Sequence, residues 1–335
     1  MRRVSLDQFR GYTVLGMICA NFLQDAPFII QHFPFLRHAG TGFGYSDSIM
    51  PQFFFAVGFA FRLTFLRRTE SQGWLAANLK AIRRSTLLLL LGLLIYGIDI
   101  RWAELQTLGL VGFFHRAFQR EFFQTITHIG LTALWVLPVI AFSWRTRLIY
   151  CAASLLVFSL LSHSFYFAWA IQRPVIDGGP LGFLSWTAPL LAGAWAYDVI
   201  EGGKDKRLLP AAAVGLMLIG SALAQLGEGS RMWVMSQRAG SVSYQVFGAG
   251  FSLLVYSFFV WVCDVKGFQS GFLNTFGMNA LAAYILDGLV SDYVVGRWIP
   301  PNGTAAVMIA LMCLQVVLCY LILRVLEKNR LFLRL

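Results

Sequence analysis

Charged side chains are scarce in this chain. Asp, Glu, Lys and Arg make up 13% of its 335 residues, whereas hydrophobic residues make up 58%. A soluble globular domain carries about 25% charged residues, so a chain with 30 phenylalanines and so few charges cannot cover a water-facing surface. The composition excludes a water-soluble protein and predicts an integral membrane protein. At about 20 residues per span, little length is left for a soluble domain.

The sequence also lacks the signatures of several common chemistries. The five cysteines show no metal-ligand spacing, and we find no zinc signature, no glycine-rich phosphate loop and no nucleophile elbow. The cysteines fall within or at the ends of apolar runs, so we expect them to be inert apolar side chains. No internal repeat is present, which disfavours transporter folds built from repeats. The N-terminal segment has no small-residue cleavage site, so the first apolar run is expected to be an anchor.

Long apolar runs are what the chain does contain. They are continuous, as in membrane-spanning helices, and are not the ten-residue alternations of a barrel. We predict an all-α polytopic membrane protein with about ten transmembrane helices and short loops, forming one domain over residues 1–335. The predicted spans are 11–30, 48–66, 86–100, 125–142, 148–168, 184–199, 208–226, 245–263, 272–292 and 304–325. The amphipathic stretch 101–124 is expected to lie on the membrane surface.

The basic residues are divided unevenly between the two sides of this topology. Eighteen Lys and Arg residues, Arg147 among them, fall in the termini and loops of one side, against eight on the other. The positive-inside rule then predicts that both termini are cytoplasmic. Arg62 lies inside a span and is expected to snorkel to the basic side. Because the basic residues are scattered through short loops, the net charge of +11 gives no case for nucleic-acid binding.

Polar residues inside the predicted spans are the candidates for function, because they are costly in a bilayer. Asp7, Arg10 and Asn21 share one face of the first span, and Gln24 and Asp25 continue it. Arg10 and Asn21 are within about 20° of each other around the helix and about 16 Å apart along it. This stripe runs from the cytoplasmic end to the outer mouth. The alternative is a simple ion pair between Asp7 and Arg10 at the helix end.

Two later spans carry polar counterparts to this stripe. The ninth contains Asn279 and Asp287, and the sixth contains Ser185 after the turn Asp177-Gly178-Gly179-Pro180. Asn279 is equally suited to join helices by hydrogen bonds. We expect Asp287 to lie near the outer interface, in contact with solvent.

One histidine stands out as a candidate acid or base. Histidine is the side chain best able to move a proton near neutral pH, and His38 shares a loop with Asp47, which begins the second span. His32, His115, His128 and His163 compete for this role. His128 and His163 lie at the ends of predicted spans, where a histidine is often an interfacial hydrogen-bonding group, and His115 lies in the exposed amphipathic stretch. The sequence therefore predicts a reaction centre at the outer end of the first two spans.

An ordered series of motifs extends along the chain. It comprises Ser5-x-Asp7-x-x-Arg10-Gly11, then Asn21, His38 and Asp47-x-x-x-Pro51-x-Phe53-Phe54, and downstream IDGGPLGFLSWTAPLLAG, SVSYQVFGAGFSLLVYSFFVWVCDVKG and FGMNALAAYILDG. In order and spacing this series resembles the heparan-α-glucosaminide N-acetyltransferase family of lysosomal and bacterial polytopic acetyltransferases. The resemblance covers nearly the whole chain.

The resemblance implies acetyl transfer from cytosolic acetyl-CoA, a co-substrate, to the amino group of a glucosamine-type sugar on the far side of a bacterial inner membrane. It implies His38 as the catalytic histidine, Asn21 as the active-site asparagine and Asp47 as the loop aspartate. Arg10, Asn279 and Ser185 are the candidate contacts to the donor, and no metal is expected. Expected partners are acetyl-CoA, an amino-sugar or oligosaccharide acceptor and the lipid bilayer, with a homodimer as a further option.

The chain departs from the family pattern at several positions. The loop from His38 to Asp47 is one residue short, and the loop from Asn21 to His38 is longer. Gly178 replaces the usual acidic residue, and His128 stands where relatives often have arginine. Loop lengths shape the outer pocket, so these changes leave the acceptor less certain than the chemistry.

Acetyl transfer to an amine needs a base for the amine proton and a donor for the developing oxyanion. A neutral His38 suits the first task and the side-chain NH₂ of Asn21 suits the second, with Asp47 selecting the tautomer of the imidazole. Transient acetylation of His38 remains an alternative route. The alternative functions are export of a polar solute, O-acylation of a sugar, and a structural role without chemistry.

Overall fold

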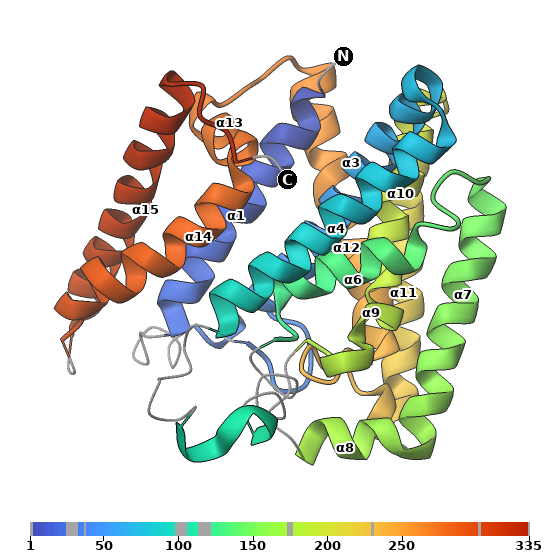
Figure 1. The fold of residues 1–335 in the computed structure, drawn as a ribbon, viewed down its shortest axis with the longest axis horizontal. Helices are drawn as coiled ribbons and strands as arrows, with labels where there is room; N and C mark the ends of the chain where they lie inside the picture. The colour runs from blue at the N-terminus through green and yellow to red at the C-terminus, as the bar shows by residue number, and fades with distance from the viewer. Residues whose placement is uncertain are drawn as a thin grey trace. The chain divides into compact units, whose positions relative to one another are not determined.

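The computed structural model describes residues 3–24, 33–36, 38–97, 106–112, 122–172, 177–228, 231–300 and 303–333. Throughout these ranges the regular elements are helices and none is a strand (Figure 1). The prediction of an all-α protein is confirmed for this part of the chain. Most of the amphipathic stretch 101–124 lies outside the described residues, although 106–112 are helical.

The helices of the described ranges follow one another in chain order. They are α1 (Val4–Gln24), α3 (Tyr45–Gln72), α4 (Trp74–Gly97), α6 (Thr125–Val136), α7 (Trp144–Leu161), α8 (Phe167–Gln172), α9 (Gly182–Ser185), α10 (Thr187–Glu201), α11 (Leu208–Gln225), α12 (Val242–Phe259), α13 (Gly271–Met278), α14 (Ala280–Val290) and α15 (Ala305–Lys328). Wider helical turns extend α7, α12 and α14 at η3 (Ser162–Tyr166), η7 (Val260–Val265) and η8 (Ser291–Val295).

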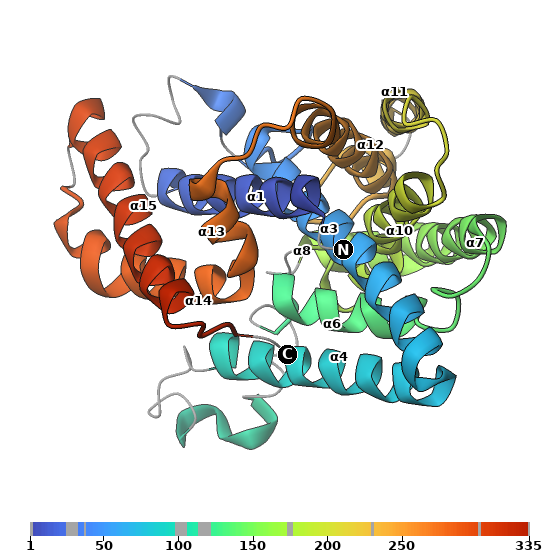
Figure 2. The ribbon, with the colours of Figure 1, turned by 90° about the horizontal axis from the view of Figure 1, so that it is seen from above.

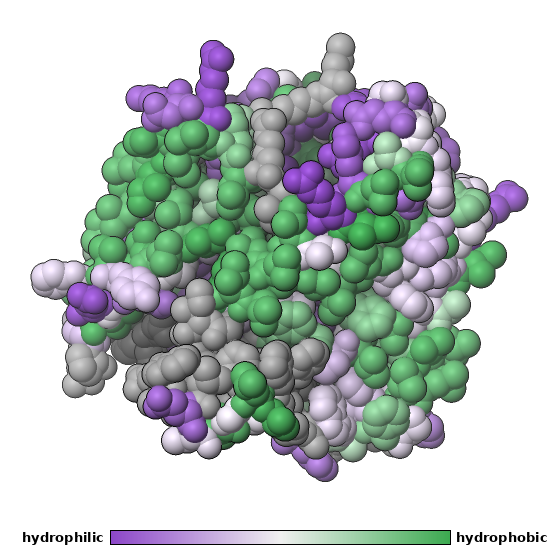
Figure 3. Space-filling view, in the orientation of Figure 1, coloured by the Kyte–Doolittle hydropathy of each residue, from purple (hydrophilic) through white to green (hydrophobic). Residues whose placement is uncertain are grey.

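Within the part of the chain that the structure describes, five helical segments are long and apolar enough to cross a bilayer: Tyr45–Gln72, Trp144–Gln172, Leu208–Gln225, Val242–Val265 and Ala305–Lys328. The surface of helix α15 is suited to contact with lipid. It exposes a row of hydrophobic side chains, and the same region is strongly hydrophobic in Figure 3. A helical membrane protein fits these elements, whereas the number of ten spans stays a prediction.

The Cα positions group into two units. The first comprises Met1–Ala39, Phe43–Phe53 and Val255–Arg334, and the second comprises Gly40–Gly42, Phe54–Leu254 and Leu335. Helices α3 and α12 therefore contribute residues to both. Whether the chain forms the single domain predicted from its sequence stays open, and each unit is described by itself.

In the first unit, α1 packs against α13, α14 and α15 (Figure 2). The crossing of α1 and α13 is very close, because a Cβ on Gly11 would lie 1.9 Å from the carbonyl oxygen of Leu273, and one on Gly277 would lie 1.9 Å from that of Asp7. Small residues allow such backbone contact between membrane helices. Val14, Ile18 and Phe276 fill the core beside this crossing.

In the second unit, a buried ion cluster joins α3, α7 and α10. Arg62 Nε donates to Asp198 Oδ1 at 3.0 Å, and Arg147 pairs with the other oxygen of the same carboxylate. Arg147 is 2% exposed and Arg62 is 8% exposed. The expectation that Arg147 is a loop cation is therefore wrong, because it is a buried residue of α7, and Arg62 is buried in its ion pair with Asp198. Both cations are retained inside because a carboxylate compensates them.

Two predicted spans differ from the helices found there. Helix α4 begins at Trp74, well before the predicted start of the third span at residue 86. Lys80 and Arg83 are therefore helical and do not lie in a loop. The predicted span 272–292 is divided at Asn279, which separates α13 from α14. Hydrophobicity indicates which part of a helix suits lipid, but the hydrogen-bonded helix extends into its polar ends.

Candidate active site

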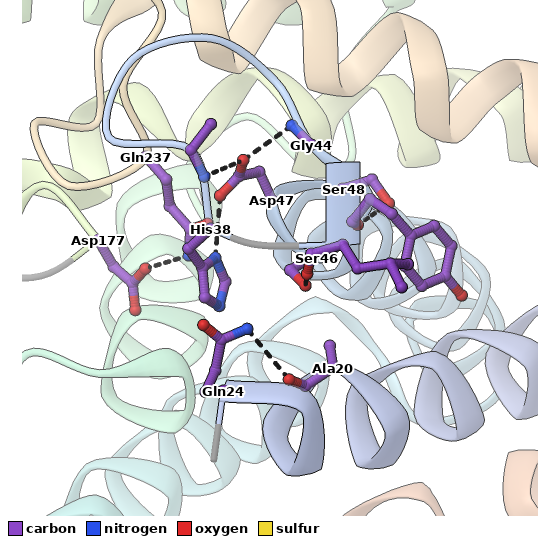
Figure 4. A network of polar contacts seen from close by, with 12 residues as sticks. Ala20, Gln24, His38, Gly44, Ser46, Asp47, Ser48, Asp177 and Gln237 are labelled. Carbon is purple, nitrogen blue, oxygen red and sulfur yellow. Dashed lines mark hydrogen bonds and ion pairs between the residues drawn. The ribbon is translucent and has the colours of Figure 1, made fainter. Parts of the chain in front are cut away.

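The loop before α3 brings His38 and Asp47 together. His38 Nδ1 lies 2.9 Å from Asp47 Oδ1, and the two residues are joined by this hydrogen bond in Figure 4. The Asp47 side chain is 1% exposed, whereas that of His38 is 43% exposed. The structure therefore contains the predicted pair, in which a buried carboxylate accepts a hydrogen bond from an accessible imidazole.

Asp47 is held by the backbone of the loop that it closes. Its Oδ2 accepts the N–H groups of Ala39, at 3.0 Å, and Gly44, at 2.8 Å. Ser46 Oγ adds a bond of 2.5 Å to the carbonyl oxygen of Leu36. Asp47 also stands in the first turn of α3, where the helix dipole favours negative charge. These contacts fix the carboxylate before any substrate binds.

This arrangement selects one tautomer of the imidazole. An ionised carboxylate only accepts hydrogen bonds, so Nδ1 of His38 carries the proton and donates it to Asp47. The other ring nitrogen, Nε2, then carries the lone pair, and the His38 side chain is 43% exposed. In Figure 4 the ring points toward the end of α1, where Gln24 lies. Gln24 Nε2 donates to the carbonyl oxygen of Ala20 at 3.2 Å.

Asn21 belongs to a second polar network within the same unit. Its Nδ2 donates to Asp287 Oδ2 at 2.7 Å, and Gln315 Nε2 donates to Asp287 Oδ1 at 2.7 Å. Asp287 is only 2% exposed, so the expectation that it contacts solvent is wrong. Helices α1, α14 and α15 surround its carboxylate, which leaves Asn21 as the exposed member of the network.

Arg10 lies one turn after Asp7 on α1. Its Nη1 is 3.9 Å from Asp7 Oδ1, and its side chain is 33% exposed while that of Asp7 is 11% exposed. The ion pair that the sequence offered as the simpler alternative is thus present. It leaves part of the guanidinium accessible, so an interaction with an anionic ligand remains a prediction.

Asn279 and Ser185 bond locally. Asn279 Nδ2 donates to the carbonyl oxygen of Thr275, one turn earlier, at 3.0 Å. Ser185 Oγ donates to the carbonyl oxygen of Gly182 at 3.0 Å. Asn279 lies in the first unit and Ser185 in the second. Both are buried, and the bonds described support a structural role as well as they support contact with a donor.

The glycine-rich turn before α9 lies in the second unit beside His128. Asp177, Gly178 and Gly179 have φ values of 55°, 84° and 59°, a left-handed run that glycine adopts without strain. Gln237 Nε2 donates to Asp177 Oδ1 at 2.8 Å, and Trp186 Nε1 donates to the carbonyl oxygen of Asp177 at 2.7 Å. The turn is therefore tied to its own unit through both side chain and backbone.

His128 is less suited than His38 to act as the base. It is 0% exposed and is enclosed by the rings of Phe123 and Trp186, with centroid distances of 6.1 Å and 6.5 Å. Neither ring nitrogen has a hydrogen-bond partner of good geometry in the part of the chain described. Water cannot reach this ring directly, whereas it can reach His38. His32, His115 and Asp25 lie outside the described residues.

Sequence reasoning missed the partnership of Asn21 with Asp287 and Gln315. Gln315 did carry a signal, because it is an uncharged polar residue amid the long apolar run of α15, and such residues usually bond between helices. Among the described residues, no group of three or more His, Cys, Asp or Glu side chains is placed to hold a metal ion.

No protein-family model matches this chain, and no curated protein matches it either. The function must therefore be argued from the residues themselves.

Proposed function

We propose that this protein transfers an acetyl group from cytosolic acetyl-CoA to the amino group of a glucosamine-type sugar on the far side of the membrane. The observation that carries the proposal is the hydrogen bond between His38 and Asp47. A buried, backbone-held carboxylate that orients an accessible imidazole is the arrangement that general-base catalysis requires. The motif resemblance supplies the reaction class.

In this proposal His38 acts on the acceptor. Nε2 takes a proton from the sugar ammonium, which frees the nitrogen lone pair. The nitrogen then bonds to the acetyl carbonyl carbon and loses a second proton, and the carbon–sulfur bond breaks. The departing thiolate takes up one of the two protons, so that one proton is released overall. A positioned base contributes about 10²–10⁴ to such a rate. Asp47 holds the imidazole in the required tautomer and stabilises the imidazolium as it forms.

Asn21 is the proposed oxyanion donor. Its side-chain NH₂ has two N–H groups, of which one is used by Asp287, and the other is available to the carbonyl oxygen as negative charge develops there. One such donor is worth about 10²–10³ in rate. A general base and an oxyanion donor of this kind need no metal ion.

Acetyl-CoA is the donor substrate, and it supplies the activated thioester. Its nucleotide end is strongly anionic, so the accessible side of the Arg10 guanidinium is a suitable contact for a phosphate. Arg10 and Asn21 are about 16 Å apart along α1 by helix rise, a length that the extended pantetheine arm can cover. In this arrangement the Arg10 guanidinium interacts with the phosphate of the ligand and with Asp7 at the same time.

An acceptor screen tests the proposal. Purified full-length protein is mixed with acetyl-CoA and either glucosamine-terminated oligosaccharide or its N-acetylated counterpart, and release of free CoA thiol is measured. Thiol release with the free amine alone supports N-acetyl transfer. Release with both acceptors indicates transfer to a hydroxyl, and release with neither overturns acetyl transfer.

A matched pair of histidine variants assigns the base. His38→Ala should abolish transfer and leave folding and CoA binding largely intact. His163→Ala is the control, since His163 is an exposed histidine in the second unit. Transfer by well-folded His38→Ala within a few-fold of wild type would contradict the assignment of the base.

A further inference from the structure

The buried carboxylate of Asp287 has no evident role in holding charge. Both of its oxygens accept side-chain amide hydrogens, from Asn21 and Gln315, each at 2.7 Å. Within the described ranges no Lys or Arg side chain pairs with it. A carboxylate at 2% exposure is costly to bury, and helices could be joined more cheaply by neutral groups. We therefore look for a role of Asp287 that a neutral residue would perform less well.

The effect of Asp287 on Asn21 supplies such a task. A side-chain amide presents a donor on one side and an acceptor on the other, and it can turn over. A carboxylate accepts only, so it holds Asn21 with the NH₂ group facing inward. Bonding one N–H of that group to Asp287 fixes the direction of the other, and Asn21 as a residue is exposed.

Gln315 completes the arrangement from α15. By donating to Oδ1 it restrains the plane of the carboxylate, so that Oδ2 remains directed at Asn21. The three residues come from α1, α14 and α15, and all belong to the first unit. The two hydrogen bonds thus connect Gln315 through Asp287 to Asn21, whose side-chain amide is accessible.

We propose that Asp287 is a positioning residue, which orients the free N–H of Asn21 toward the acyl oxygen of the substrate. This inference rests on the acetyl transfer proposed above. Asp287 itself does not touch substrate. A purely structural link between the three helices is the competing explanation, and the two differ in what an isosteric neutral residue does.

Asp287→Asn is the discriminating variant. Asparagine has nearly the same shape and can still bond both neighbours, so the helices stay linked and the melting temperature should change little. It offers a donor as well as an acceptor, so it no longer dictates which way Asn21 faces. We expect kcat to fall by about 10- to 100-fold, with the KM for acetyl-CoA within about twofold of wild type.

Thr275→Val is the matched control. Thr275 Oγ1 donates to Glu327 Oε2 at 2.7 Å, so this variant also removes a part-buried hydrogen bond between helices of the first unit. It should leave kcat unchanged. The double variant Asn21→Ala/Asp287→Asn should be no slower than Asn21→Ala alone, because both changes act on one donor.

Three outcomes overturn the inference. They are a kcat of Asp287→Asn within about threefold of wild type, a multiplicative loss in the double variant, and an equal kcat loss in the Thr275→Val control. If Asp287→Asn does not fold, Gln315→Met replaces it, with an expected severalfold fall in kcat at constant KM and refutation if kcat is unchanged. A wild-type protein that transfers no acetyl group to any amine overturns the proposed function before any variant is compared.

Discussion

Replacing Asp47 by asparagine tests the proposed catalytic centre most directly. Asp47 Oδ2 accepts two backbone N–H groups, whereas Oδ1 is the oxygen bonded to His38 Nδ1. The single oxygen of an asparagine at this position will therefore face the two backbone groups, and its NH₂ will face His38. The imidazole must then offer the lone pair of Nδ1, which moves its proton to Nε2 and removes the base.

The size of the effect follows from this change of tautomer. The equivalent change in the serine protease triad lowers kcat about 10⁴-fold with its geometry intact, and a general base is worth about 10²–10⁴. We expect Asp47→Asn to lower kcat by about 10²–10⁴. Loss of the charge at the start of α3 and of its charge-assisted bonds should cost about 1–2 kcal/mol of stability, too little to unfold the protein.

The assay is CoA thiol release at saturating acetyl-CoA, with the melting temperature of each variant measured in the same detergent. Asp205→Asn is the matched control, because Asp205 Oδ1 also accepts a backbone N–H, from Arg207 at 2.9 Å, but on an exposed loop. A well-folded Asp47→Asn protein with kcat within about threefold of wild type would refute the tautomer argument.

Three further predictions concern other parts of the chain. Arg10→Ala should weaken acetyl-CoA binding by about one to three kcal/mol if Arg10 meets a phosphate; unchanged affinity, with equal loss of stability in Asp7→Ala, would contradict this. In a background without the native cysteines, a cysteine at Thr41 should react with an impermeant thiol reagent in intact cells while one at Ser71 is shielded, and the reverse pattern would invert the topology. Asp198→Asn should destabilise the protein by about 3–5 kcal/mol, seen in its melting temperature, because it leaves buried arginines uncompensated; an unchanged melting temperature would show that the ion cluster is dispensable.

The helical architecture could be predicted because apolar runs are local. The run at 48–66, for example, falls within α3, and the run at 304–325 begins one residue before α15 and otherwise falls within it. The ends of the helices could not be predicted in the same way. Residues 74–85 are rich in Ala, Leu, Lys and Arg, which favour helix, but their charges resemble those of a loop when only hydropathy is considered. Helix α4 therefore begins a dozen residues earlier than expected.

The two networks of the first unit differ in how predictable they were. His38 and Asp47 are nine residues apart, so a short loop confines them to the same neighbourhood and their pairing could be anticipated. Asn21 and Asp287 are 266 residues apart. Helical periodicity indicates which face of α1 is polar, but it does not say which helix covers that face. The same reason explains why Arg147 was assigned to a loop while Asp198 holds it in the interior.

The contacts of α1 also limit where chemistry can occur. Its first polar side chains are occupied: Ser5 Oγ donates to Asp264, and Gln8 exchanges two hydrogen bonds with the backbone of Ser270. Ser5 and Gln8 are almost fully buried, so they fasten α1 to the C-terminal part of the first unit and are not open to a ligand. A donor arm that follows α1 must therefore lie on the side where Arg10 is exposed. Between Arg10 and Asn21, Tyr12 and Cys19 are only partly exposed, whereas Asn21 and Gln24 are exposed. We therefore expect the proposed acyl transfer to occur at the end of α1 nearest the His38 loop.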